Sequence, residues 1–277
     1  MTFELLILKK EWFYHHRDDQ YRFEGIKKLV NKSYDKSRFK FGIIQTQRIK
    51  SSQTIPEDLA LQDVDDFNLF ILLGSNEVFK KLSYEDGYIR DFSQDATNLE
   101  QSYDCDIPEK YYTLFDLSKI DDLKITIVDN DFNLDLNIIS RSLGSAGFRT
   151  YKHTTLKDED IELELTAFTS FMRKAGPKIL NLVLDKCILN SKYFSLLFPT
   201  LPPLNHYKKL ILHADVIKEH KLVEYYVSAC SFVPSPKDDI LLEIADDNMV
   251  MAGPLECGIY ATQNFHISFI HREILLK

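Results

Sequence analysis

The chain has 277 residues, of which 44% are hydrophobic and 27% charged, the balance of a soluble globular protein. Its 42 acidic residues outnumber its 34 basic residues, and the formal net charge of −8 argues against a general nucleic-acid or anionic-membrane binder. No apolar run has the length of a membrane span, and no secretory signal is visible, so we expect no membrane partner and a cytoplasmic or nuclear location. The cysteines lack the Cys-x-x-Cys spacing of zinc ribbons and thioredoxins, and no metal site is predicted.

The first part of the chain predicts strands and helices in alternation. Residues 2–9 predict a strand, and the apolar spacing over 23–34 predicts a helix. Pro56 suits the first turn of a second helix. A compact apolar strand is expected over 67–73, and residues 78–89 are expected to return as its hairpin partner.

The middle of the chain is more polar and gives weaker signals. Residues 91–112 predict a mobile loop, and 123–128 predict an alternating strand. Residues 134–139 fit a helix or a strand, and the glycines of 144–147 predict a turn.

The last part again alternates strands with helices. Residues 161–171 predict a strand and 177–190 a helix, followed by a strand over 209–214 and a helix over 218–229. A final strand is expected over 264–270. The whole order predicts a mixed α/β chain with a central sheet and helices on its faces.

A basic, glycine-containing turn lies between the strand at 161–171 and the helix after it. It reads Arg173-Lys174-Ala175-Gly176-Pro177-Lys178. A helix N-terminus offers unpaired N–H groups to an anion, and a glycine lets the backbone approach a phosphate closely. An ordinary basic turn is the alternative. Residues 141–146 match an R-x-x-G-x-A pattern more fully, but the residues after them look extended, so context favours 173–178.

This order of strand, R-x-x-G turn, helix, strand and tyrosine-bearing helix resembles the GNAT superfamily of acyl-CoA-dependent N-acyltransferases. The sequence departs from the family motif at Lys178, where Gly or Ala is usual, and lacks the usual Gly near Cys230. The resemblance implies an α+β fold in a single domain over 1–277, with a mostly antiparallel central sheet flanked by helices. Residues 91–155 would be a large insertion before the fourth strand, partly a mobile loop.

The resemblance also implies a chemistry, in which an amine attacks the thioester of acetyl-CoA directly. The thiolate acid would be Tyr226, and Glu164 or Glu162 would act as the base; core packing of the tyrosine and a solvated face for the glutamates are the alternatives. The pyrophosphate and the acyl oxygen would lie against the backbone of the following residues, all of which except Pro177 have an N–H to donate: Phe168, Arg173, Lys174, Ala175, Gly176, Pro177 and Lys178.

Three hypotheses of function therefore stand at this point. The first is an N-acetyltransferase that uses acetyl-CoA and acts on an amine of a protein or a small molecule. The second is a catalytically inactive GNAT-like fold that serves as a protein-interaction subunit, with a partner bound through 91–155. The third is an unrelated α/β interaction domain, because a fold by itself does not establish an activity.

Overall fold

The computed structural model describes residues 2–16, 19–93, 105–120, 122–151, 159–251, 255 and 258–276. Within these ranges nine strands form one mixed sheet in the order β3-β1-β2-β4-β5-β6-β9-β7, with β8 also paired to β9. The strands are β1 (Phe3–Lys9), β2 (Phe67–Leu73), β3 (Leu123–Ile127), β4 (Ser142–Thr150), β5 (Asp160–Ser170), β6 (Lys209–Ile217), β7 (Val233–Pro234), β8 (Ile240–Leu242) and β9 (Phe265–Leu275).

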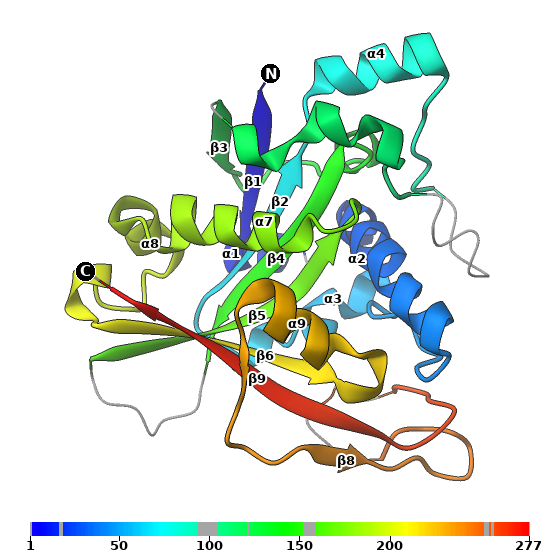
Figure 1. Ribbon diagram of the computed structural model, residues 1–277, viewed down its shortest axis with the longest axis vertical. Coiled ribbons are helices and arrows are strands. Elements are labelled where there is room, and N and C mark those ends of the chain that lie inside the picture. Colours follow the sequence, from blue (N-terminus) through cyan, green and yellow to red (C-terminus); the bar gives the residue numbers. More distant parts are fainter. Residues whose placement is uncertain are drawn as a thin grey trace.

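Helices cover both faces of the sheet (Figure 1). The α-helices are α1 (Lys10–His15), α2 (Gln20–Phe41), α3 (Ile55–Asp58), α4 (Asn76–Asp86), α6 (Leu136–Ile139), α7 (Gly176–Val183), α8 (Ser191–Leu197) and α9 (Leu222–Cys230). Short 3-10 turns lie at 52–54, 61–63, 109–115, 117–119, 204–206 and 218–220, and a π-helical turn follows α7 at 184–188.

The alternation of side chains along the strands divides the core into two layers. Leu5, Ile7 and Phe70 point to one face, where they pack with α7, α8 and α9. Leu6 and Leu69 point to the other face, where they pack with α1, α2 and α3. Successive side chains of a strand point to opposite faces, so each strand contributes to both layers.

The predicted mixed α/β fold with a mostly antiparallel sheet flanked by helices is confirmed. The pairs β1–β3 and β5–β6 are parallel and the other pairs are antiparallel. Strands predicted at 2–9, 67–73, 123–128, 161–171, 209–214 and 264–270 all exist, and the helix predicted at 23–34 extends over the whole of α2.

Two predictions of local structure are wrong. Residues 78–89 do not return as a hairpin strand, because 76–86 form α4 and β2 pairs with β1 and β4 instead. The glycines at 144–147 do not form a turn. They lie inside β4, where a Cβ at Gly144 would overlap the Thr169 carbonyl oxygen, so they allow the close approach of β5.

Residues 91–155, predicted as an insertion, contain β3 and β4 and so supply two strands of the sheet. Much of the predicted mobile loop, residues 94–104, lies outside the described residues. The role of this segment as a place for a protein partner stays a prediction.

Candidate functional site: a cleft between two parallel strands

The strands β5 and β6 separate part-way along their length and leave a cleft between them. Their parallel pairing runs from Asp160 and Lys209 to Glu164 and His213, and no further pair follows. Beyond that point β5 remains paired to β4, and β6 remains paired to β9 as far as Ile217. A bulge in β5, with Ala167 at a φ of 44°, accompanies the separation.

The cleft has a volume of about 500 Å³ and reaches from α9 on one face of the sheet to α2 on the other. This is within the range of about 300–1,000 Å³ that is usual for small-molecule sites. On the α9 side its wall is apolar and aromatic, with Phe168, Leu222, Tyr225 and Tyr226. Polar and charged side chains from α2, β4, β5 and β6 line the rest.

Two carboxylates lie in the wall near the point where the strands separate. The carboxylate of Glu164 accepts two hydrogen bonds from Arg149, at 2.9 Å from Nε and 2.6 Å from Nη2. Asp215 shares this wall, and within the described residues its carboxylate has no hydrogen bond and no ion pair. Of these two carboxylates, that of Glu164 is neutralised and that of Asp215 is open to a ligand.

The Asp215 carboxylate is exposed to the solvent of the cleft but is crowded by the protein on most sides. Burial and, to a smaller extent, the negative charge of Glu164 raise the pKa of this carboxyl to about 6. The positive charges of Lys237 and Arg149 oppose this shift. Asp215 is thus ionised at neutral pH but close to its titration.

The pair of glutamates predicted as a base is only partly brought to the cleft. Glu164 lines it, whereas Glu162 lies next to His213, with 3.2 Å between Oε2 and Nε2. Their side chains are 13% and 10% exposed, so the alternative of a solvated face is wrong for both. The ring of Tyr151 stacks on His213 at a centroid distance of 4.1 Å.

Tyr226, predicted as the thiolate acid, lines the cleft but is buried among aromatic rings. Its ring lies 6.0 Å from Phe168 and 5.2 Å from Phe232, between ring centroids. Burial raises the pKa of its phenol well above the usual value of 10, so the hydroxyl stays protonated. The core packing that the sequence analysis gave as the alternative for Tyr226 is therefore observed.

The basic turn at 173–178 lies outside the cleft lining. A Cβ added at Gly176 would overlap the hydroxyl oxygen of Tyr225, so that tyrosine already occupies the approach to the glycine. The backbone N–H of Arg173 donates to the Tyr112 hydroxyl at 2.8 Å. The charged side chains are also paired: Arg173 lies 3.6 Å from Glu109, and Lys178 lies 3.8 Å from Asp116.

The other members of this turn have ordinary structural places. Lys174 has a left-handed φ of 63°, Ala175 is buried, and Pro177 is in the first turn of α7, as its lack of an N–H favours. The turn is thus built into the fold by the segment 109–116 and by α9. Its role in binding a phosphate stays a prediction, as does acetyl-CoA as a ligand.

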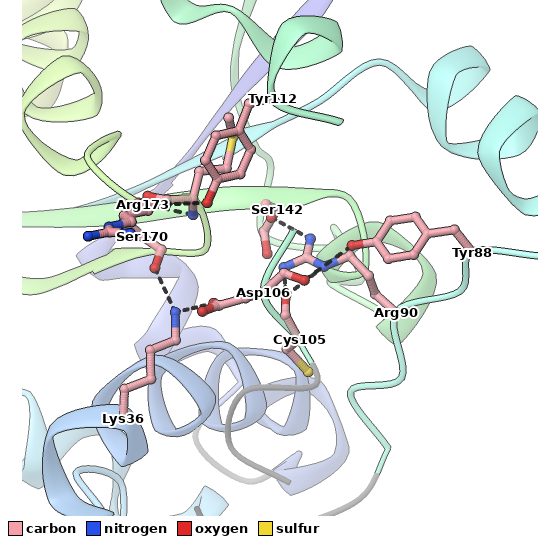
Figure 2. Close-up of polar contacts among 10 residues, drawn as sticks. Lys36, Tyr88, Arg90, Cys105, Asp106, Tyr112, Ser142, Ser170 and Arg173 are labelled. Carbon is pink, nitrogen blue, oxygen red and sulfur yellow. Dashed lines mark hydrogen bonds and ion pairs between the residues drawn. The ribbon is translucent and has the colours of Figure 1, made fainter. Parts of the chain in front are cut away.

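Contacts of Arg90 and Lys36 tie the residues that precede 109–116 to the ends of β4 and β5 (Figure 2). Arg90 is 4% exposed and donates to the carbonyl oxygens of Cys105, Ser140 and Ser142. Lys36 of α2 pairs with Asp106 and donates to the Ser170 carbonyl oxygen at 3.0 Å. These contacts fix the ends of β4 and β5 and have a structural role.

The comparison with known protein families matches residues 1–274 to the family described as sporulation protein RMD6. The chain belongs to the sporulation protein RMD6 family. No curated protein matches it. The resemblance to the GNAT superfamily is therefore wrong as a family assignment, and the N-acetyltransferase function and the inactive GNAT-like subunit inferred from it are withdrawn.

The physical reason for this error is that the matched features are generic. A strand, a glycine turn, a helix and a parallel strand are the ordinary sequence of any right-handed parallel crossover. The residue types at 173–178 correctly predicted a turn followed by a helix, but they do not specify a ligand. The RMD6 family match covers nearly the whole chain, whereas the motif covered six residues.

Arg149, Asp215 and His220 are among the cleft residues that the sequence analysis did not predict. For Asp215 a signal existed. The alternation of β6 continues through Ala214-Asp215-Val216-Ile217, and a lone carboxylate inside an apolar strand is unusual. His220 is buried against the ring of Phe41, at 5.1 Å between centroids, and burial lowers its pKa to about 4, so the imidazole is neutral.

Among the described residues there is no group of three or more His, Cys, Asp or Glu side chains that could hold a metal ion. A search of the same residues finds no helix that is long and apolar enough to cross a membrane.

Proposed function

We propose that this chain is a ligand-binding protein that takes an organic ammonium compound in the cleft between β5 and β6. The observation that supports this most is the Asp215 carboxylate, which faces the cleft without a described ion pair and lies beside Glu164. An ammonium group is the ligand that such a carboxylate favours, with a charge-assisted hydrogen bond that contributes about 1.5–3 kcal/mol. The aromatic wall of Phe168, Tyr225 and Tyr226 would hold the apolar part.

The charge of the cleft favours a cation over an anion. Two arginines in the cleft wall already form ion pairs, Arg149 with Glu164 and Arg38 with Asp35. The His220 imidazole adds no positive charge at neutral pH. An anionic ligand would have to approach the carboxylates of Asp215 and Glu164, whose negative charges repel it.

Three matched probes test this proposal: 4-phenylbutylamine, 4-phenylbutan-1-ol and 4-phenylbutanoate. They share one skeleton and differ in the charge of one end. Isothermal titration at pH 7.5 should give at least about tenfold tighter binding of the amine than of the alcohol, and none of the acid. Asp215→Asn should remove the preference for the amine, and Asp185→Asn, an exposed aspartate outside the cleft, should keep it.

Coenzyme A serves as a further probe in the same titrations. Binding of coenzyme A without binding of the amine, or equal affinity for the amine and the alcohol, would contradict the proposal. We also propose a role in sporulation, which the family description supports, and a location in the cytoplasm or nucleus. No disulfide joins the described cysteines, Cys105, Cys187 and Cys230, as expected in a reducing compartment. In the organism that encodes the chain, Asp215→Asn should lower spore formation toward the level of a deletion.

A further inference from the structure

An exposed apolar patch lies on the segment between β8 and β9, at the lower edge of the molecule in Figure 1. Leu241 and Met251 are 48% and 47% exposed, and Tyr260 and Met249 are 42% and 39% exposed. We call these four residues the Met patch. Two of the chain's four methionines belong to it, which makes the patch unusual for a surface.

Backbone pairing places the Met patch on one face of a small sheet. The bridges Ile244 to Val250 and Met249 to Tyr260 join three short extended segments. Hydrogen bonds from the N–H of Ala245 to the Met249 oxygen, 2.8 Å, and from the N–H of Met251 to the Glu243 oxygen, 2.9 Å, fix the register.

Because side chains alternate along extended segments, this register separates an inner face from an outer face. On the inner face Leu242 and Ala261 are buried, and Ile244 and Val250 pack against the same cluster. The outer face therefore presents all four residues of the Met patch, together with Glu243. Packing of the inner face stabilises the segment, so the Met patch is not needed to hold it in place.

The segment that carries the Met patch is acidic. Residues 238–271 contain six Asp or Glu residues and no Lys or Arg. Three of the acidic residues, Glu243, Asp246 and Asp247, are exposed next to the patch. Such a rim repels anionic lipid surfaces and nucleic acids and attracts Lys and Arg.

We infer that the Met patch is a docking surface for a basic amphipathic helix of a partner protein. The apolar face of that helix would cover Leu241, Met249, Met251 and Tyr260, and its Lys and Arg residues would meet Glu243, Asp246 and Asp247. Methionine side chains are flexible and polarisable, so they adapt to apolar partners of different shape. None of the four residues of the Met patch lines the cleft between β5 and β6.

Fluorescence anisotropy with two synthetic amphipathic helices tests this inference. One helix consists of Leu and Lys, and the other has the same Leu positions with Glu in place of Lys. The intact chain should bind the Leu/Lys helix at least about tenfold more tightly than the Leu/Glu helix. Added salt should weaken the binding.

The variant Leu241→Ser/Met249→Ser/Met251→Ser should lose this binding by at least about tenfold. The matched control is Tyr84→Ser/Ile89→Ser, since these side chains are 92% and 74% exposed elsewhere on the surface, and it should bind as the unmodified chain does. A second variant, Asp246→Lys/Asp247→Lys, should shift the preference toward the Leu/Glu helix, and it tests the inference even if the serine variant fails to fold.

Equal binding of the two helices, or unchanged binding by both patch variants, would overturn the inference. Sedimentation velocity adds a further outcome. If the chain is a dimer that the serine variant converts to a monomer, a second copy covers the patch and the proposed partner is wrong.

Discussion

Replacing Asp215 with Asn should make the protein more stable at neutral and basic pH. In the folded chain this carboxyl has a pKa of about 6, raised from the ordinary value of 3.8 by burial and by Glu164. A group whose folded pKa is raised stabilises the fold fully only below its unfolded pKa, and the stabilisation is lost as the pH rises through the folded pKa. Above pH 6 the ionised Asp215 therefore costs stability that a neutral asparagine does not.

The size of this effect follows from the two pKa values. The difference between 3.8 and about 6 corresponds to about 3 kcal/mol if the group were sealed from water. Asp215 is open to the solvent of the cleft, so screening reduces the expected gain of Asp215→Asn to about 1 kcal/mol at pH 8. The gain should be about half as large at pH 5 and should vanish below pH 3.8.

Urea unfolding followed by circular dichroism at pH 5 and pH 8 measures this difference. The control Asp185→Asn removes an exposed carboxylate and should leave the midpoint unchanged at both pH values. If Asp215→Asn is no more stable than the unmodified chain at pH 8, the carboxylate is not crowded and the reasoning about the cleft wall is wrong. A stabilised variant that has lost the ligand is the signature of a residue kept for binding.

Three further changes test the structural account. Arg90→Met should lower the free energy of unfolding by about 3 kcal/mol, because it leaves the carbonyl oxygens of Cys105 and Ser142 without their buried donor. Urea unfolding measures this loss. A loss under about 1 kcal/mol would contradict the anchoring role. Gly176→Ala should lower the free energy of unfolding by about 1–3 kcal/mol, because the added Cβ overlaps the Tyr225 hydroxyl. In a double-mutant cycle Tyr225→Phe should recover part of this loss. Additive effects of the two substitutions would show that the two groups do not meet. Arg149→Met should raise the pH at which the amine probe begins to bind, because loss of the positive charge raises the pKa of Asp215; an unchanged titration profile would exclude this coupling.

The secondary structure of the second half was predictable from the sequence because its signals are local. The alternation over β5 and the apolar spacing over α7 predicted the correct elements and their order. The element at 76–86 was predicted as a strand from its position after β2. The helix preference of its residues favours α4, and Gly87 ends the helix in a left-handed conformation. The hairpin interpretation overlooked both signals.

The glycines of β4 show where local signals fail. Gly144 and Gly147 lie against the backbone of β5, at Thr169 and Thr166, and the need for close approach is a tertiary fact. From the sequence alone the same glycines favour a turn. Only the packing of β5 against these glycines distinguishes a strand from a turn at residues 144–147.

The candidate site was harder to predict than the fold. The separation of β5 from β6 depends on where two distant strands stop pairing, and no local pattern marks that point. The conspicuous basic turn at 173–178 has its charges paired by Glu109 and Asp116, which are about 60 residues away in the chain. Asp215, in contrast, is marked in the sequence only as a carboxylate within an apolar strand, and its importance comes from the cleft around it.

The most direct test of the central claim is the dissociation constant of 4-phenylbutylamine measured from pH 5 to pH 7.5. The amine stays protonated throughout, so a change in affinity reports titration of the protein, and Glu164, Lys237, Arg149 and His213 are the groups whose charges act on Asp215. With a pKa of about 6 for Asp215, affinity should rise about tenfold between pH 5 and pH 7, and Asp215→Asn should abolish the rise. A dissociation constant that is independent of pH, or a rise that Asp215→Asn leaves intact, would show that the ammonium group does not bind at this carboxylate.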